Sequence, residues 1–191
     1  MDPVDSKKAA RQAEVVRAAT DVFLRYGFAR TTMGDVATAT GISRPALYLI
    51  FPGKEELFAA VARQMDVESH AQMRAGLPAY STLAAKLHFV CEIWGSHGFD
   101  IMSAHPDARD LFDLNYPPVQ EIYDHFQELV VELIAEAVVR SGVRASATEL
   151  ARTLVYAMRG FREIATSSVD MRRLISLQVS QLVALIEGSR G

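Results

Sequence analysis

Arg44 and Lys54 are the cationic side chains whose chemistry and placement say most about this sequence. A guanidinium can donate two hydrogen bonds to the O6 and N7 atoms of one guanine, and an ammonium can bind a phosphate. Both lie within Thr31–Phe58, TTMGDVATATGISRPALYLIFPGKEELF, which reads as two short helical segments separated by a glycine. Two short helices joined by a tight turn are typical of motifs that place a helix in a groove of DNA.

The residue types around these cations predict where the two helices begin and end. Thr32 and Asp35 have the spacing of a helix N-cap pair, so the first helix begins after Thr32. Gly41 adopts a left-handed backbone at little cost and would end that helix, and Ser43 can cap the next one. The pattern predicts a helix-turn-helix over about residues 32–51.

The second helix needs support from a longer one. Leu47 and Phe51 lie four residues apart and should pack inward, which leaves the other face of the helix exposed. So short a helix is not stable alone, so the preceding segment must act as its platform. The apolar residues of that platform, at helical spacing, are Val15, Ala19, Val22, Phe23 and Tyr26.

These residues resemble the TetR/AcrR family of transcriptional regulators, through FLRYGF, TTM, DVA, TGIS, ALY and F-x-x-KEEL. The resemblance implies an all-α fold of about nine helices. An N-terminal tail at 1–8 would precede a three-helix DNA-binding domain at 9–69, and residues 70–191 would form a ligand-binding and dimerisation domain. It also implies a homodimeric repressor that a small effector releases from a palindromic double-stranded DNA operator.

The resemblance assigns Tyr48 and Lys54 to phosphate contacts and Thr32 to another contact with the DNA backbone. The alternatives are a packing aromatic for Tyr48 and a solvated side chain for Lys54. We favour Arg44 for base reading over a phosphate contact or a free surface charge. The candidate DNA-binding set is Thr32, Ser43, Arg44, Pro45, Ala46, Tyr48, Leu49 and Lys54. Leu49 and Ile50 replace the aromatic and histidine that relatives often place there, so a customary polar contact is missing.

Charge is divided unevenly along the 191 residues. The formal net charge is −3, but the nine basic and seven acidic residues up to Arg63 give +2, which leaves −5 for the remainder. Exposed charges are screened beyond about 8 Å at physiological salt, so a modest basic face can bind DNA beneath an acidic body.

The rest of the chain has an apolar period close to 3.6 residues, which predicts helices. Breaks are expected near Ala75–Ser81, Ser96–Phe99, Asn115–Pro118, Ser141–Ser146 and Ser167–Ser168. We expect a helix from Lys54 towards Arg74 to connect the two domains. Asp124, Glu128, Glu132 and Glu136 run four apart, and the column should face water, although a partner-binding stripe is the alternative.

The C-terminal half is the expected effector domain, and its aromatic residues suit an apolar or aromatic ligand. Each of these side chains could instead belong to the ordinary core. The candidate pocket residues are Phe89, Trp94, Phe99, Met102, Phe112, Tyr116, Tyr123, Phe126, Met158 and Phe161. Arg159 could be a buried charge that answers an acidic ligand, but we favour an ion pair at the surface or at an interface.

The last two helices carry more apolar surface than one neighbour needs. In the final helix the polar residues Arg172, Arg173, Ser176, Ser180 and Glu187 occupy about 100° of arc, and apolar residues cover most of the remainder. This predicts a homodimer through the last two helices, with a buried helix of a monomer as the alternative.

Other classes find less support in the sequence. No G-x-S-x-G, P-loop or G-x-G-x-x-G is present, so we expect no enzyme and no cofactor. His88, Glu92, His97, His105 and Asp107 only loosely suggest metal ligands. No apolar run reaches the roughly 20 residues that cross a bilayer, so we expect no membrane partner and a cytoplasmic protein.

Overall fold

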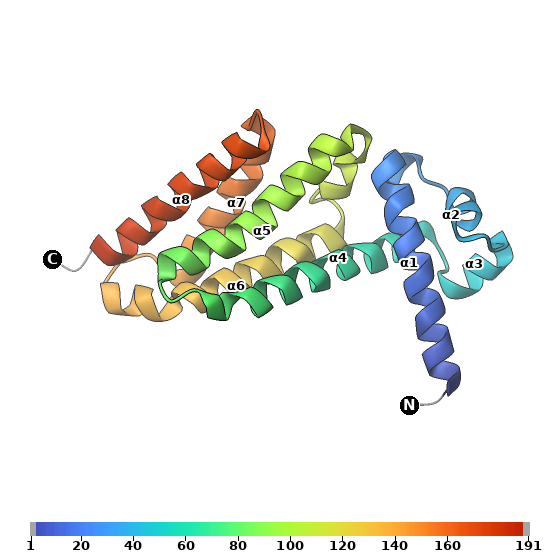
Figure 1. Ribbon diagram of the computed structural model, residues 1–191, viewed down its shortest axis with the longest axis horizontal. Helices are drawn as coiled ribbons and strands as arrows, with labels where there is room; N and C mark the ends of the chain where they lie inside the picture. Colours follow the sequence, from blue (N-terminus) through green and yellow to red (C-terminus); the bar gives the residue numbers. More distant parts are fainter. Residues whose placement is uncertain (1–2, 189–191) are drawn as a thin grey trace. The chain divides into compact units, whose positions relative to one another are not determined.

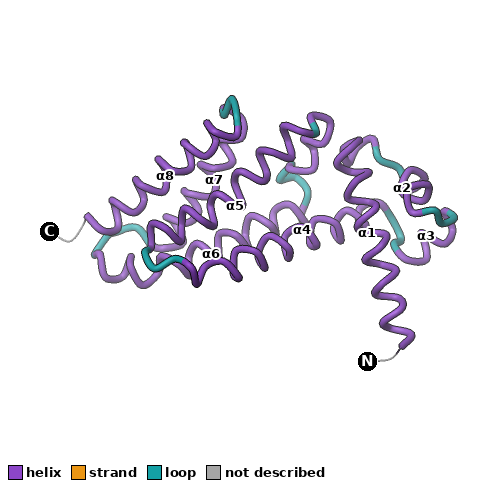
Figure 2. The backbone as a smooth tube through the Cα atoms, viewed as in Figure 1, coloured by secondary structure: helices purple, strands orange, loops and turns teal. Residues whose placement is uncertain are grey.

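The computed structural model describes residues 3–188, and all the regular structure in that range is helical (Figures 1 and 2). The all-α prediction is therefore confirmed. Of the expected N-terminal tail, residues 1 and 2 lie outside the described residues, and residues 3–8 already belong to the first helix. The expected last domain likewise extends into residues 189–191, which also lie outside them.

Eight α-helices and two short 3-10 helices make up the described range. In chain order they are α1 (Pro3–Arg30), α2 (Met33–Thr40), α3 (Arg44–Ile50), α4 (Lys54–Gly76), η1 (Leu77–Ala79), α5 (Leu83–Ala104), η2 (Pro106–Phe112), α6 (Pro117–Ser141), α7 (Ala147–Ile164) and α8 (Ser168–Gly188).

The helices group into two compact units. The first unit contains the chain up to Val67 together with Ala104–Gln120, and the second contains Glu68–Ser103 and the chain from Glu121 onward. Helix α4 runs through both. The sequence boundary at residue 69 lies close to Val67, but the sequence did not place Ala104–Gln120 with the N-terminal helices. That segment contains η2, which packs on α1.

Helix α1 is the platform of the first unit, and α2 and α3 lie beside it (Figure 1). Val15, Ala19 and Phe23 are fully buried, as expected. Tyr26 is not part of the platform, because its exposed fraction is 41%. Gly27 leaves the helical backbone with φ +75°, so the chain kinks there and the buried ring after the kink is Phe28.

In the second unit α5, α6, α7 and α8 run alongside one another (Figure 1). The break expected at Ser96–Phe99 is wrong, because α5 continues through it. The glycines there permit close packing instead. A Cβ on Gly95 would lie 2.7 Å from Met158 Cε, and one on Gly98 would lie 2.9 Å from Arg162 Cζ.

The acidic residues of α6 lie on its exposed side, as predicted. Two of them bind arginines rather than water alone. Glu132 pairs with Arg74 of α4 at 2.6 Å, and Glu136 pairs with Arg140 one turn along α6. Two of the four acidic residues of the column therefore have ion-pair partners within the chain.

Candidate nucleic-acid interface

The helix-turn-helix is fixed at both ends of α2 by hydrogen bonds that the residue types dictate. The Thr32 hydroxyl accepts from the Asp35 amide at 3.2 Å, and the Asp35 carboxylate accepts from the Thr32 amide at 2.8 Å. This reciprocal capping box confirms the predicted start of the helix. Bonds from the hydroxyl and then the amide of Thr32 hold the pKa of Asp35 below its ordinary value.

Gly41 ends α2 in the left-handed conformation, with φ +65° and ψ 22°. The amides of Gly41 and Ile42 donate to carbonyl oxygens of the last turn of α2. Two residues later the Ser43 hydroxyl accepts from the Ala46 amide at 3.3 Å and caps α3. The turn therefore sets the direction of α3 through backbone bonds on both sides of it.

Helix α3 has one face buried and one face exposed. Leu47 is fully buried and Phe51, its C-cap, is also buried, as predicted. Arg44, Pro45 and Tyr48 are exposed, Ala46 is half-buried, and Leu49 has an exposed fraction of 88%. The side chain of Leu49 thus leaves apolar surface uncovered near the end of α3.

Lys54 begins α4 and is anchored to the end of α1. Its Nζ donates to the carbonyl oxygen of Phe28 at 2.8 Å and to that of Ala29 at 3.4 Å, and it lies 4.4 Å from the centre of the Phe28 ring. These carbonyls lie at the end of a helix, where they lack helical partners. Nothing in the local sequence around Lys54 indicates this capping role.

Asp110 of η2 binds the backbone amides of the same two residues, Phe28 and Ala29. Its two carboxylate oxygens accept from the amides of Phe28 at 2.9 Å and Ala29 at 2.8 Å. The kink at Gly27 takes these amides out of the helical pattern. Sequence reasoning missed Asp110, although a glycine inside a helical pattern signals a kink whose amides need acceptors. No local signal names an acceptor about 80 residues away.

An aromatic cluster completes this junction in the first unit. The ring of Tyr116 lies 4.8 Å from that of Phe28 and 5.7 Å from that of Phe58, and Phe28 and Phe58 are 4.9 Å apart. Partial burial, together with the charges of Asp110, Asp113 and Glu55, raises the pKa of Tyr116. Tyr116 therefore packs against rings of α1 and α4, in a different unit from most of the expected effector pocket.

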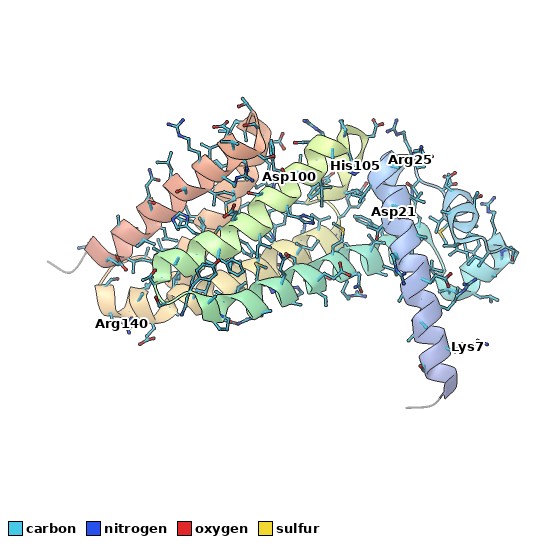
Figure 3. The ribbon with its side chains drawn as sticks, in the orientation of Figure 1. Lys7, Asp21, Arg25, Asp100, His105 and Arg140 are labelled. Carbon is cyan, nitrogen blue, oxygen red and sulfur yellow. The ribbon has the colours of Figure 1, made fainter. Side chains whose placement is uncertain are left out.

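A basic and apolar groove lies between the start of α1 and the tip of α3. It has a volume of about 880 Å³ and is lined by Lys7, Lys8, Ala10, Arg11, Glu14, Leu49 and Ile50. Figure 3 shows Lys7 towards one end of α1, with Asp21 and Arg25 towards the other. The basic residues of the α1 start thus share one groove with two residues of α3.

The expected effector residues are divided between the two units. Trp94, Tyr123 and Phe126 meet in the core of the second unit, where Trp94 stacks on Phe126 at 4.5 Å. Phe99, Met102 and Met158 are also buried, and Phe89 and Phe161 are half-buried. Phe112 and Tyr116 belong to the first unit. Phe89 also lines a groove of about 350 Å³ with residues of α4 and α5.

The buried arginine of α7 is Arg162, whereas Arg159 is exposed. Arg162 Nη1 donates to the Tyr123 hydroxyl at 3.0 Å, and its guanidinium lies 4.3 Å from the centre of the Trp94 ring. Burial lowers the pKa of Arg162. Arg159 is therefore not a buried charge, which agrees with the favoured surface position. The side chain that faces the core is three residues, or nearly one turn, further along the helix.

Two other hypotheses can be compared with the described residues. Within 3–188, no three side chains of His, Cys, Asp or Glu are placed to hold one metal ion. Over the same range no helix is both long enough and apolar enough to span a bilayer.

Comparison with known proteins shows which family this helical arrangement resembles. Residues 15–61 match the family of bacterial regulatory proteins, tetR family. The N-terminal part of the chain is thus a TetR-type regulatory segment. The matched range contains the later part of the platform helix α1, the helix-turn-helix and the start of α4. Proteins of this family are DNA-binding regulators and not enzymes.

Individual relatives agree with this assignment. The chain is 51% identical to the HTH-type transcriptional regulator YfiR of Bacillus subtilis over 51 residues, which is 27% of this chain and 25% of YfiR. It is 23% identical to YhgD of the same organism over 72% of this chain and 71% of YhgD. A TetR regulator of Chloroflexus aurantiacus, 18% identical, has the same fold with a TM-score of 0.70 over 93% of this chain and 96% of that one.

Proposed function

We propose that this protein is a cytoplasmic, homodimeric repressor of the TetR family that binds a palindromic operator and is released by a small, largely apolar or aromatic effector. The observation that carries the proposal is the exposed face of α3, which is capped at its start, buried through Leu47 on its other side and matched to the family over its whole length. A rigid helix with Arg44 and Leu49 exposed suits a major groove.

The candidate contacts divide by chemistry. Arg44 would read a guanine, and Ala46 and Leu49 would meet thymine methyls. Tyr48 and Lys54 would bind phosphates and fix the register. An ammonium has three donors, of which Lys54 directs two at α1 carbonyls, so its third donor would serve a phosphate. The remaining candidates, at the starts of α2 and α3, are Thr32, Ser43 and Pro45.

Selection of bound sequences from a pool of random duplexes tests this function. We expect a palindrome with half-sites about one or more helical turns apart, and binding that weakens as salt rises. Arg44→Ala should reduce discrimination at one base position by about 1–3 kcal/mol. Arg172→Ala is the matched control, because this exposed arginine lies on α8. Failure of the wild-type protein to enrich any sequence would remove the proposal.

The dimer is proposed through α7 and α8, which pack on each other. Both helices also carry large apolar side chains on their outer surface. Ile164 of α7 has an exposed fraction of 64%, and Leu177 of α8 one of 53%. A second copy would cover these residues and place two α3 helices on successive major grooves.

Sedimentation equilibrium measures this association directly. Leu177→Glu should shift the protein towards monomer, because it would bury a charge in an apolar contact. Arg173→Glu changes an exposed polar position of the same helix and should leave the mass unchanged. A wild-type protein that sediments as a monomer at all concentrations contradicts the dimer.

The effector would bind in the second unit among the aromatic residues around Trp94, Tyr123 and Phe126. Trp94 is the only tryptophan of the chain, so its fluorescence reports on ligands near this cluster. By linkage, a ligand that weakens operator binding must itself bind less tightly to the DNA complex. The selected operator and a panel of apolar aromatic compounds allow both affinities to be measured. A compound that quenches Trp94 to saturation without changing the affinity for the operator is not the effector. If every compound that binds leaves the operator affinity unchanged, release by a ligand of this class is refuted.

A further inference from the structure

Residues 104–120 connect α5 to α6, yet they belong to the first unit together with the DNA-reading helices. Asp110 joins this segment to α1, because its carboxylate accepts from the Phe28 and Ala29 amides at 2.9 and 2.8 Å. Two nearly equal bonds to one carboxylate fix both the distance and the orientation of the backbone they hold.

The same two residues are held from the other side by Lys54. Their carbonyls accept from its Nζ at 2.8 and 3.4 Å. The Phe28–Ala29 backbone is therefore clamped between an anion from η2 and a cation at the start of α4. Lys54 follows the last residue of α3 by only four positions, so its place constrains the end of that helix.

The close approach of η2 to α1 at Gly27 indicates a specific contact between them. A Cβ on Gly27 would lie 2.4 Å from the Asp107 carbonyl oxygen and 2.7 Å from Asp110 Oδ1, so only glycine admits η2. Arg30, the last residue of α1, pairs with Asp107 of η2 at 2.7 Å. Ala108, between the two aspartates, is fully buried.

We propose that Asp110 is a positioning residue for DNA recognition, which sets the orientation of α3 through the Phe28–Ala29 backbone and Lys54. The inference rests on the proposed DNA-binding function and adds to it a residue outside the helix-turn-helix. Its consequence is that the α5–α6 connection forms part of the reading apparatus, so that a displacement of either helix end reaches α3 through one carboxylate.

The sign of the effect separates positioning from simple electrostatics. An aspartate near DNA repels phosphates, so its neutralisation on charge grounds alone would strengthen all DNA binding. Positioning predicts the opposite for the operator, because a misplaced α3 loses base contacts. Binding to unrelated duplex depends on charge rather than on base contacts, so it should not weaken.

The test compares Asp110→Asn with Asp113→Asn in the full chain. Each change removes one negative charge from the same segment. Asp113 Oδ1 accepts a single bond from the Asn115 amide at 2.9 Å, and an asparagine oxygen can keep that bond. Asparagine at 110 cannot keep both, because one of its two polar atoms is a donor. Asp110→Ala removes both acceptors without adding a donor and serves as a second variant.

The measured quantity is the ratio of affinities for the wild-type-selected operator and for an unrelated duplex of equal length. We expect the ratio to fall by about tenfold in both Asp110 variants and to stay unchanged in Asp113→Asn. Hydrogen exchange at the Phe28 and Ala29 amides should accelerate in the same two variants. Partial unfolding would lower both affinities together and leave the ratio constant.

The outcomes are distinguishable. If the wild-type protein enriches no operator, the proposed function fails. If it enriches one and the ratio in Asp110→Asn and Asp110→Ala equals that of Asp113→Asn, the positioning role is overturned while the function stands. A ratio that stays constant while both affinities fall has the same meaning, because it assigns Asp110 to stability alone.

Discussion

Replacement of Gly27 by alanine is the most direct test of the junction between η2 and α1. The residue has φ +75° and ψ 169°, and a Cβ would lie 2.4 Å from the Asp107 carbonyl oxygen. Gly41→Ala is a matched control. Gly41 also has positive φ, at +65°, but no atom lies within 4 Å of its Cβ position.

Two terms contribute to the cost at Gly27. Its backbone conformation is essentially restricted to glycine, and holding another residue there costs about 1–3 kcal/mol. The steric contact then forces η2 away and disturbs the Asp110 hydrogen bonds, for which about 1.5–3 kcal/mol is typical. We expect the first unit to lose roughly 3 kcal/mol or more in free energy of unfolding. Gly41→Ala should cost only about 1–2 kcal/mol, because alanine tolerates the left-handed region better.

Urea unfolding followed by far-UV circular dichroism measures the loss, and hydrogen exchange of α1 and α2 assigns it to the first unit. Two units can unfold separately, so the exchange data are needed beside the global curve. Equal losses in Gly27→Ala and Gly41→Ala would show that the approach of η2 adds nothing. Such a result would contradict a role for the η2 contact in holding the end of α1.

Three further predictions follow from single contacts. Because the folded pKa of Asp35 is lowered, its stabilising effect is present above about pH 4 and is lost as pH falls through the folded pKa, so urea unfolding of wild type and Asp35→Asn should converge in acid. Burial raises the pKa of Cys91, so a thiol reagent should modify it only at the rate of native-state opening, and rapid modification of folded protein would contradict this. Gly98→Ala should destabilise the second unit by about 1–3 kcal/mol, because the new Cβ would displace Arg162. Gly160→Ala has no atom within 4 Å of its Cβ position and should stabilise α7 by up to about 1 kcal/mol. Thermal unfolding midpoints that move in the same direction in both variants would contradict this pair of predictions.

The helix-turn-helix could be predicted from sequence because its determinants are local. Thr32 and Asp35 are three residues apart, and Gly41 and Ser43 act on the backbone next to them. The inward face of α3 follows from one helical turn between Leu47 and Phe51. Short-range rules of this kind need no knowledge of the rest of the fold.

Residues whose role depends on distant partners could not be predicted. The glycines of α5 resemble a break in sequence, but Gly98 admits a guanidinium from α7 instead. Which arginine of α7 is buried depends on the rotation of that helix. The sequence favours a surface or interface position for Arg159, but it does not indicate that Arg162 is the buried one. Asp110 lies in an unremarkable polar segment whose partners are about 80 residues earlier.

The anchoring of Lys54 also changes what its substitution can reveal. A lysine that only bound phosphate would, when neutralised, reduce the salt dependence of DNA binding by about one released ion and leave the protein fold intact. Lys54 additionally caps α1 opposite Asp110, so its loss exposes two carbonyls and releases the start of α4. Loss of affinity in a Lys54 variant therefore cannot be assigned to phosphate binding unless the salt slope changes as well. The proposed phosphate contact and the observed contact with α1 share one side chain, and by the proposed positioning role α3 keeps its orientation only while the Asp110 carboxylate and the Lys54 ammonium both bind the Phe28–Ala29 backbone.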